Sequence, residues 1–278
     1  MNIDQLIASA FEEDIGDGDH TSLACIEKDK TGKAKLLVKE KGIIAGVELA
    51  KKIFHFADTN LDVQVFIKDG KEINPGDVVL EVSGSELSIL KSERIVLNFM
   101  QRMSGIATAT HKLNQIIKHT HAKLLDTRKT TPLLREVEKM AVKTGGGENH
   151  RFGLYDMILI KDNHIDFCGG INNALKNTHR YLTENNLDLK IEVEARTLDD
   201  VKSIINYGGL HRIMLDNFTP AKLKEAVELI NGKYETEASG GINETNIREY
   251  AETGVDFISV GALTHHIKSL DLSLKAVK

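Results

Sequence analysis

The sequence of 278 residues has few cysteines, no long apolar run and no excess of basic residues. Two cysteines, Cys25 and Cys168, are too few for a disulfide framework and fit the reducing cytoplasm. No run of about 18 apolar residues is present, so we expect no membrane-spanning helix, and the first residues lack the apolar core of a signal peptide. The formal charge of −5 argues against a nucleic-acid partner. These absences predict a soluble cytoplasmic protein.

Motifs that mark common enzyme sites are also missing. The sequence contains no GxGxxG fingerprint, no HExxH or paired CxxC metal pattern and no nucleophile elbow. The glycine run at 145–147 lacks the Lys-Ser/Thr ending of a phosphate-binding Walker loop. His265 and His266 are adjacent and do not share a helix face, so we do not expect them to hold a metal ion.

Six short apolar runs in the second half of the chain each end on charged or polar residues. They span 122–129, 156–164, 189–196, 211–217, 234–241 and 255–262. Helix-like stretches follow most of these runs, and this repetition predicts a parallel sheet in a barrel or layered α/β domain. Because the chemistry of such barrels lies where the strands end, the residues after each run become candidate site residues.

The first part of the chain predicts a smaller α+β domain. Its expected strands lie at 33–39, 43–47, 63–68 and 77–82. A helical pattern then runs over 86–118, and we expect Gly105 to break or kink that helix. We therefore predict an α+β domain over 1–115 and an α/β barrel over 116–265, with the segment 266–278 packing back on the first domain.

Basic residues gather at the ends of the expected strands. Arg128 and Lys129 follow the first run, Lys161 ends another, and His150 and Arg151 follow the glycine run. Guanidinium groups match carboxylates and phosphates, while lysine supplies a compact charge. Two like charges about 4 Å apart repel by roughly 4 kcal/mol at an effective dielectric constant near 20. A cavity that holds such a cluster indicates a polyanionic ligand.

Acidic residues and glycines end the remaining strands. Glu194 and Asp216 are placed to bind Mg²⁺, to accept hydrogen bonds from sugar hydroxyls, or to act as acid and base. Glu192 alternates with Glu194 and shares its strand face. Loops after two consecutive late strands often hold a phosphate. The residues in those two turns are Ser239, Gly240 and Gly241, then Val260, Gly261 and Ala262.

Ordered motifs along nearly the whole chain resemble the quinolinate phosphoribosyltransferase family. They occupy 92–110, 124–132 (LLDTRKTTP), 138–164, 191–195 (IEVEA), 213–217 (IMLDN), 237–243 (EASGGIN) and 250–265. The resemblance implies an N-terminal α+β, sandwich-like domain and an open, incomplete α/β barrel. It also implies the transfer of the phosphoribosyl group of PRPP to quinolinate with Mg²⁺. The expected products are nicotinate mononucleotide, pyrophosphate and CO₂, in de novo NAD biosynthesis.

The resemblance assigns roles to the candidate residues. Those implied to hold the quinolinate carboxylates are Arg128, His150, Arg151 and Lys161. Those implied to meet PRPP, its ribose or Mg²⁺ are Lys129, Glu194 and Asp216, and the implied catalytic set is Lys129, Lys161, Glu194 and Asp216. The 5′-phosphate would lie against Ser239, Gly240, Gly241, Val260, Gly261 and Ala262. Arg94 would reach the active site of a partner subunit, which implies a homodimer and leaves a hexamer open.

Two positions depart from the family pattern, and three other functions stay open. Leu133 stands where the family usually has glycine, and His266 where it often has a small residue. One rival function is an aldolase-like lyase with Lys161 as the Schiff-base lysine. The others are a paralogue that accompanies molybdate transport genes and a non-catalytic phosphate-binding module. The combined RK, HR and KDNH motifs favour the transferase.

Overall fold

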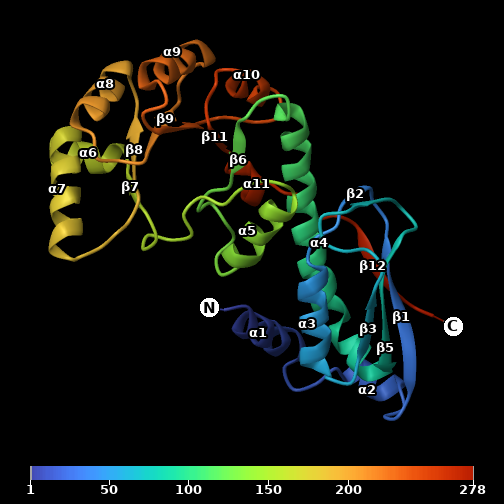
Figure 1. The fold of residues 1–278 in the computed structure, drawn as a ribbon. Coiled ribbons are helices and arrows are strands. Elements are labelled where there is room, and N and C mark those ends of the chain that lie inside the picture. Colours follow the sequence, from blue (N-terminus) through green and yellow to red (C-terminus); the bar gives the residue numbers. More distant parts are fainter. Residues whose placement is uncertain (1, 278) are drawn as a thin grey trace. The chain divides into compact units, whose positions relative to one another are not determined.

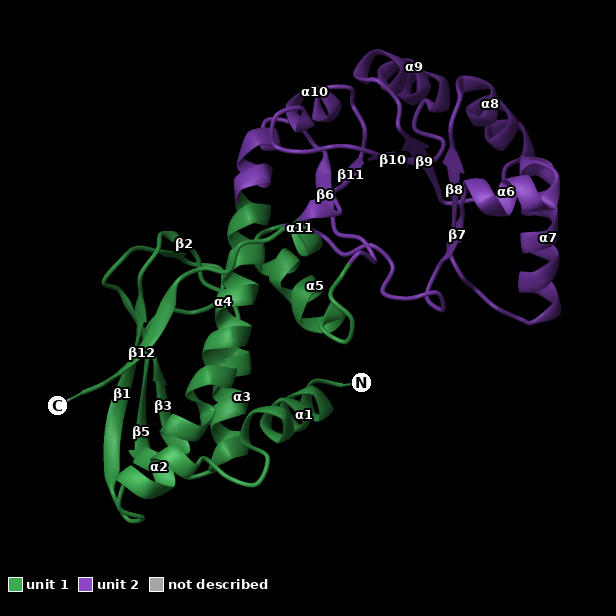
Figure 2. Cartoon of the chain, turned by 180° about the vertical axis from the view of Figure 1, so that it is seen from behind, with its two compact units in different colours: residues 1–111, 130–146, 263–278 green, residues 112–129, 147–262 purple. Residues whose placement is uncertain are grey.

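The computed structural model describes residues 2–277, which form two compact units (Figures 1 and 2). Unit 1 contains the residues up to His111, the segment Thr130–Gly146 and the residues from Leu263 onward. Unit 2 contains Lys112–Lys129 and Gly147–Ala262. The division differs from the predicted domain boundaries chiefly because Thr130–Gly146 belongs to unit 1. None of the helices in the described part of the chain combines the length and apolar character needed to cross a membrane.

Unit 1 is built around an antiparallel sheet in the strand order β12-β1-β5-β3. Its elements up to the long helix are α1 (Ile3–Ile15), α2 (His20–Cys25), β1 (Thr31–Val38), β2 (Gly42–Ile43), α3 (Val47–Ala57), β3 (Asp62–Val65), β4 (Glu72–Ile73) and β5 (Val78–Ser85). The last strand, β12 (Leu272–Ala276), pairs with β1. The chain therefore returns to its first sheet at the C-terminal end.

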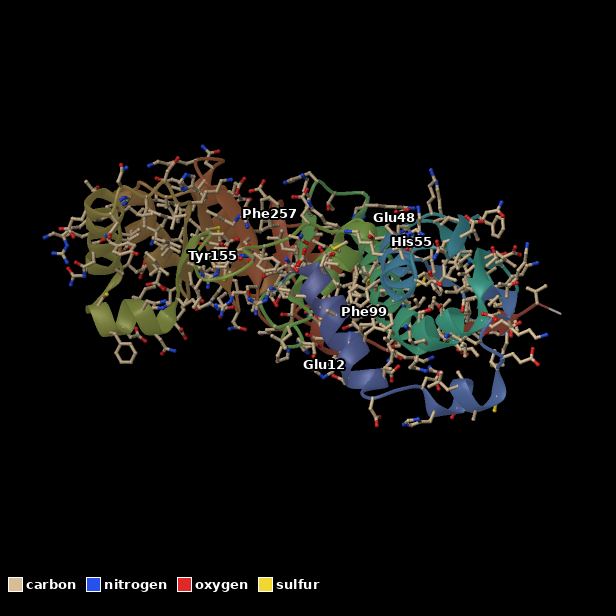
Figure 3. The ribbon with its side chains drawn as sticks, turned by 90° about the horizontal axis from the view of Figure 1, so that it is seen from below. Glu12, Glu48, His55, Phe99, Tyr155 and Phe257 are labelled. Atoms are coloured by element: carbon tan, nitrogen blue, oxygen red, sulfur yellow. The ribbon has the colours of Figure 1, made fainter. Side chains whose placement is uncertain are left out.

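Helix α3 shows why unit 1 has a core. Val47, Ala50 and Phe54 recur at helical spacing and are buried, so one face of α3 is apolar. Its polar residues include Glu48 and His55, which are exposed near the two ends of the helix and are labelled in Figure 3. This separation of apolar and polar residues is what a helix that covers a core requires.

The long helix α4 (Glu86–Ile117) runs unbroken through Gly105, so the predicted break at this residue is wrong. A Cβ atom on residue 105 would lie 2.3 Å from the carbonyl oxygen of Lys268. Glycine is therefore required by the close approach of the C-terminal segment. The cost of glycine within a helix is offset by this packing.

A buried ion pair ties the segment Thr130–Gly146, with its helix α5 (Arg135–Thr144), to unit 1. Glu138 on α5 has no exposed surface, and Arg102 Nη2 donates to its Oε1 at 2.8 Å. The other carboxylate oxygen accepts the Thr131 N–H at 3.1 Å. Arg102 also donates to the carbonyl of Thr264 at 2.6 Å. Local periodicity in the sequence gives no sign of this long-range ion pair.

Unit 2 contains a parallel sheet in the order β6-β11-β10-β9-β8-β7. Its strands are β6 (Lys123–Leu125), β7 (Ile158–Ile160), β8 (Ile191–Ala195), β9 (Arg212–Asp216), β10 (Glu235–Ser239) and β11 (Phe257–Ser259). The helices are α6 (Asp162–Cys168), α7 (Ile171–Glu184), α8 (Leu198–Tyr207), α9 (Pro220–Ile230) and α10 (Ile247–Ala251), with α11 (Ala262–His265) starting at the unit boundary. Strands β6 and β7 end this sheet without pairing with each other in the described chain. The predicted fold class, an open α/β barrel after a sheet domain, is confirmed.

Candidate active site

The parallel order of the strands aligns their carboxyl ends along one edge of the sheet in unit 2. Along this edge, the structure places Arg128 and Lys129 after β6, Val260, Gly261 and Ala262 after β11, Ser239, Gly240 and Gly241 at the end of β10, Asp216 at the end of β9, Glu194 near the end of β8, and Lys161 after β7. These residues come from distant parts of the sequence and share one edge. Arg94 lies exposed on α4 in unit 1.

Two arginines form the cationic part of the site. Arg128 and Arg151 are both half-buried. Burial lowers the pKa of Arg151, and the positive charge of Arg128 lowers it further, whereas Glu192 and Asp156 act in the opposite direction. The repulsion predicted from the sequence is therefore present between these two guanidinium groups.

The two predicted lysines are more exposed than the arginines. Lys161 precedes α6 as its N-cap, and its side chain is exposed although three apolar residues come before it. The stem of Lys161 is not buried in the sheet, because the chain turns into α6 directly after β7. Lys129 is exposed as well. Both residues remain at the strand ends, where a ligand bound above the sheet would meet them.

Glu194 and Asp216 form the acidic part of the site. Glu194 is buried, and burial raises the pKa of its carboxyl, with further increases from the charges of Asp216 and Asp162. Lys161 opposes this increase. Asp216 is half-buried, and its Oδ2 accepts a hydrogen bond of 2.6 Å from Asn217 Nδ2. Two neighbouring carboxylates that repel each other provide a site for a cation or for hydrogen-bond donors.

The turn after β10 packs tightly against the turn after β9. Gly240 has φ +97°, and a Cβ atom there would lie 2.2 Å from Asn217 Oδ1. The Asn217 N–H donates to the carbonyl of Ser239 at 2.9 Å. Gly241 has φ +63° and open space around it. Glycine is needed here both for its backbone conformation and for the close approach of Asn217.

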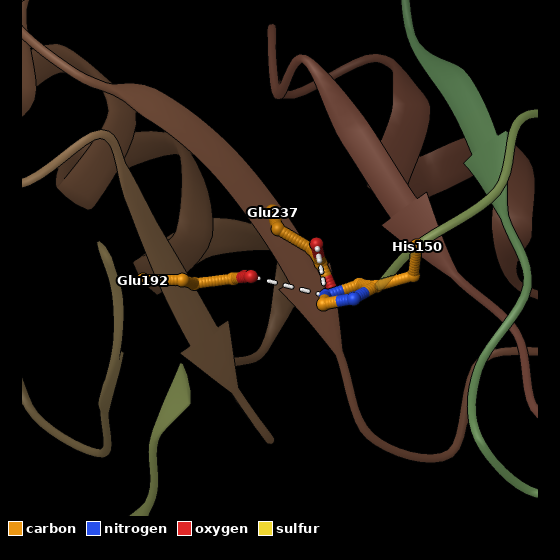
Figure 4. A group of neighbouring side chains, drawn as sticks. All are labelled: His150, Glu192 and Glu237. Atoms are coloured by element: carbon orange, nitrogen blue, oxygen red, sulfur yellow. Dashed lines mark ion pairs between the residues drawn. The ribbon is translucent and has the colours of Figure 1, made fainter. Parts of the chain in front are cut away.

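His150 lies inside the sheet domain of unit 2. Its backbone N–H donates to Asp126 Oδ1 at 2.9 Å, which fixes it to the end of β6. Its ring atom Nε2 lies 3.0 Å from Glu192 Oε2 and 3.4 Å from Glu237 Oε2 (Figure 4). The sequence predicted that His150 would hold a substrate carboxylate. In the structure this ring nitrogen faces two carboxylates of the protein.

Buried charges shift the ionisation of this group. Burial alone would lower the pKa of His150, but the carboxylates of Glu192 and Glu237 outweigh it and raise the pKa to about 9. Burial and the Glu237 charge raise the pKa of Glu192 to about 7. Burial opposes ionisation of Glu237 as well, yet His150 and Arg212 bring its pKa below the usual range.

Sequence reasoning missed Glu237 and Arg212. Arg212 Nη1 donates to Glu237 Oε2 at 3.0 Å, and the guanidinium lies 4.0 Å from the ring centroid of Phe257 (labelled in Figure 3). A signal was available, because charged residues alternate along β8, β9 and β10 on the face that carries Glu194 and Asp216. Alternation with period two places such residues on one side of a sheet.

Fold and site together define a class of enzyme. An open α/β barrel that combines paired arginines, paired carboxylates and a glycine turn at its strand ends suits a small substrate bearing carboxylates and phosphates. The model of the quinolinate phosphoribosyl transferase N-terminal domain matches residues 19–104, and that of the C-terminal domain matches residues 106–275. The chain belongs to the quinolinate phosphoribosyltransferase family.

Individual relatives agree over almost the full length. The chain is 48% identical over 285 residues to the chloroplastic nicotinate-nucleotide pyrophosphorylase (carboxylating) of Arabidopsis thaliana, covering 97% of this chain and 81% of that protein. It is 41% identical to a probable nicotinate-nucleotide pyrophosphorylase (carboxylating) of Bacillus subtilis, covering 99% and 93%. The solved nicotinate-nucleotide pyrophosphorylase of Francisella tularensis superposes with a TM-score of 0.91 at 38% identity, covering 99% and 96%.

Proposed function

We propose that this chain transfers the phosphoribosyl group of PRPP to quinolinate and releases nicotinate mononucleotide, pyrophosphate and CO₂. Family membership over both domains supports this reaction. The observation that carries the proposal is the half-buried Arg128 at the sheet edge that also carries Glu194 and Asp216, with Arg151 following a segment that bridges to the end of β6. One substrate must neutralise two cations, and the other must carry groups that two carboxylates bind. The reaction is a step of NAD biosynthesis.

The arginines suit the carboxylates of quinolinate. Arg128 and Arg151 repel each other, and a dianionic ligand between them removes that repulsion. Each guanidinium has the planar geometry to pair with one carboxylate. Lys161 and Lys129, at opposite ends of the row of strands, supply further positive charge for quinolinate and for the phosphates of PRPP.

The acids and glycine turns suit PRPP. Glu194 and Asp216 accept hydrogen bonds from ribose hydroxyls, and they also stabilise the positive charge that develops at the anomeric carbon when pyrophosphate leaves. The turns at Ser239, Gly240 and Gly241 and at Val260, Gly261 and Ala262 lie on neighbouring strands, so their backbone N–H groups bind the 5′-phosphate together.

The carboxylate pair also fits Mg²⁺, which takes oxygen ligands and binds sites that combine carboxylates with substrate phosphates. Glu194 and Asp216 would hold the ion directly or through water. A bound Mg²⁺ neutralises charge on the departing pyrophosphate. The raised pKa of Glu194 supports this role, because a cation near the carboxyl would favour its ionised form.

Decarboxylation follows from the product of the transfer step. The pyridine nitrogen becomes cationic once it is bonded to the ribose, and its positive charge stabilises the electron pair left on the adjacent ring carbon when the 2-carboxylate departs as CO₂; that carbon then takes up a proton. The 2-carboxylate must be gripped less tightly than the 3-carboxylate, since strong pairing before the reaction would oppose its loss. The protein therefore mainly aligns the ring and excludes water.

The proposed assembly is a homodimer in which Arg94 of one subunit completes the site of its partner, in the cytoplasm. The exposed position of Arg94 on α4 supports the first part, and the two free cysteines suit a reducing compartment. Mixing inactive Arg94→Ala and Arg128→Ala proteins under conditions that exchange subunits should restore part of the activity. A mixture that stays inactive would show that Arg94 does not act across subunits.

The reaction is tested with quinolinate labelled in its 2-carboxyl group. With PRPP and Mg²⁺ the protein should release labelled CO₂ and nicotinate mononucleotide in equal amounts, and a chelator should stop the reaction. Borohydride should trap no adduct, which separates this reaction from a Schiff-base lyase. Binding of PRPP without release of pyrophosphate would instead indicate a phosphate-binding module. No labelled CO₂ above background would refute the proposal.

A further inference from the structure

A buried group of charged side chains lies inside the sheet of unit 2, and only one of its members was expected at the site. The members are His150, Glu192, Glu237 and Arg212 (Figure 4 shows the first three). Glu192 and Glu237 have no exposed surface. Burying ionised groups is costly, and an apolar core of similar volume is often more stable. A buried charged network that does not favour stability indicates a functional role for these side chains.

Hydrogen bonds and ion pairs connect this group to the site without interruption. Arg212 Nη1 donates to Glu237 Oε2 at 3.0 Å, and the same oxygen lies 3.4 Å from His150 Nε2. Glu192 Oε2 approaches that nitrogen from β8 at 3.0 Å. On the other side of the ring, the backbone N–H of Arg151 donates to His150 Nδ1 at 2.7 Å. The ring thus links two buried carboxylates to the backbone of Arg151, the residue that we propose binds quinolinate.

The same atoms raise the question of a metal ion. His150, Glu192 and Glu237 offer ligand atoms within 4.8 Å of one another. Arg212, however, already pairs with the Glu237 oxygen that faces the ring, so a divalent cation there would meet a guanidinium at close range. The Arg212 guanidinium pairs with one of the two carboxylates, and the imidazole Nε2 faces both of them. The buried charged groups therefore pair with one another and do not form a metal site.

Arg151 needs this support because of its neighbour. Its guanidinium feels the positive charge of Arg128, and repulsion alone would drive the two apart. The negative charge of Glu192 opposes this repulsion and favours the charged form of Arg151. Nη1 of the Arg151 side chain donates to the carbonyl of Met157 at 3.2 Å. Its backbone is held by the His150 ring, and the His150 backbone is held in turn by Asp126.

We propose that Glu237, anchored by Arg212 and assisted by Glu192, is a positioning residue for quinolinate, because it orients the His150 ring that fixes Arg151. This inference rests on the proposed function and adds residues that do not touch the substrate. Glu237 acts through His150 and Arg151, so its loss should weaken the use of quinolinate and leave PRPP unaffected.

A double-mutant cycle tests this route. Glu237→Gln keeps the shape of the side chain and removes its charge, and it should lower kcat/KM for quinolinate about tenfold while leaving the KM for PRPP unchanged. In an Arg151→Ala background the same substitution should have less than about a twofold effect, because residues that act through one another are not additive. A merely structural role would give equal factors in both backgrounds.

Glu235→Gln is the matched control. Glu235 lies two residues away on the same strand and also accepts from Arg212, at 2.9 Å, but it is exposed and makes no ion pair with His150. Its variant should behave like the wild type in all assays. If Glu237→Gln does not fold, Glu192→Gln carries the same cycle.

Three outcomes would overturn the inference: equal factors in the two backgrounds, an unchanged kcat/KM in the single variant, or a control variant as impaired as Glu237→Gln. Failure of the wild-type protein to use quinolinate at all would refute the proposed function instead.

Discussion

Replacing Gly240 by alanine tests the structure of the proposed phosphate turn. Residue 240 has φ +97°, a conformation that costs a residue with a Cβ atom roughly 1–2 kcal/mol. The new Cβ would lie 2.2 Å from Asn217 Oδ1 and 2.9 Å from the Asn217 backbone nitrogen. The side chain can turn away but the backbone cannot, so overpacking adds roughly 1–3 kcal/mol. The predicted loss of unfolding free energy is therefore about 2–5 kcal/mol.

The same substitution should also reduce activity. Asn217 donates to Asp216 Oδ2 at 2.6 Å, so a displaced Asn217 moves a carboxylate that is proposed to bind PRPP. A displacement of about 1 Å near reacting groups can cost roughly 100-fold in rate. Steady-state kinetics should show kcat/KM for PRPP reduced by about 10- to 100-fold.

Gly241→Ala provides the comparison for both measurements. Residue 241 has φ +63° with nothing within 4 Å of a new Cβ, so only the conformational cost of roughly 1–2 kcal/mol applies. Urea unfolding followed by circular dichroism measures the difference between the two variants. Equal losses of stability and activity in both would refute the claim that Gly240 is required by the contact with Asn217.

Three further predictions concern Arg128 in the cationic site, the backbone conformation of Leu133 and the buried charge of His150. Arg128→Ala should raise the KM for quinolinate by roughly 10- to 150-fold, because a hydrogen bond to a charged group contributes about 1.5–3 kcal/mol; an unchanged KM would remove Arg128 from the quinolinate site. Leu133→Gly should stabilise the protein against urea by about 1 kcal/mol, since Leu133 is 73% exposed and has φ +69°, and a loss of stability would contradict this account. The raised pKa of His150 stabilises the fold below pH 6.5, and this contribution should disappear as the pH rises through about 9. Urea midpoints across that range should fall less in Glu237→Gln than in the wild type, and identical slopes would contradict the assignment.

The sheet of unit 2 was predictable because its strands are marked locally. Each apolar run that ends on a polar residue became a strand of the parallel sheet, and parallel pairing brings those ends together whatever their separation in sequence. Arg128, Glu194 and Asp216 were therefore placed on one edge correctly from the pattern alone. The departure at Leu133 was also informative, because the residue that replaces the usual glycine has a positive φ.

Features that depend on distant contacts were not predictable in the same way. Gly105 was expected to interrupt a helix, but its role is set by the carbonyl of Lys268. The ion pair between Arg102 and Glu138 connects the segment Thr130–Gly146 to the rest of unit 1. The ring of His150 turned inward because Glu237 lies inside the sheet, and a single histidine in a loop carries no sign of that partner. Periodicity reports the exposed and buried faces of an element and not which residue lies opposite.

The central claim is that two half-buried arginines make this site selective for a ligand with two adjacent carboxylates. Calorimetric titration of the protein with quinolinate and with nicotinate, which lacks the 2-carboxylate, measures that selectivity directly. Loss of one charge-assisted pair should weaken binding of nicotinate by roughly 10- to 150-fold relative to quinolinate. Equal affinity for the two pyridine acids would contradict the account.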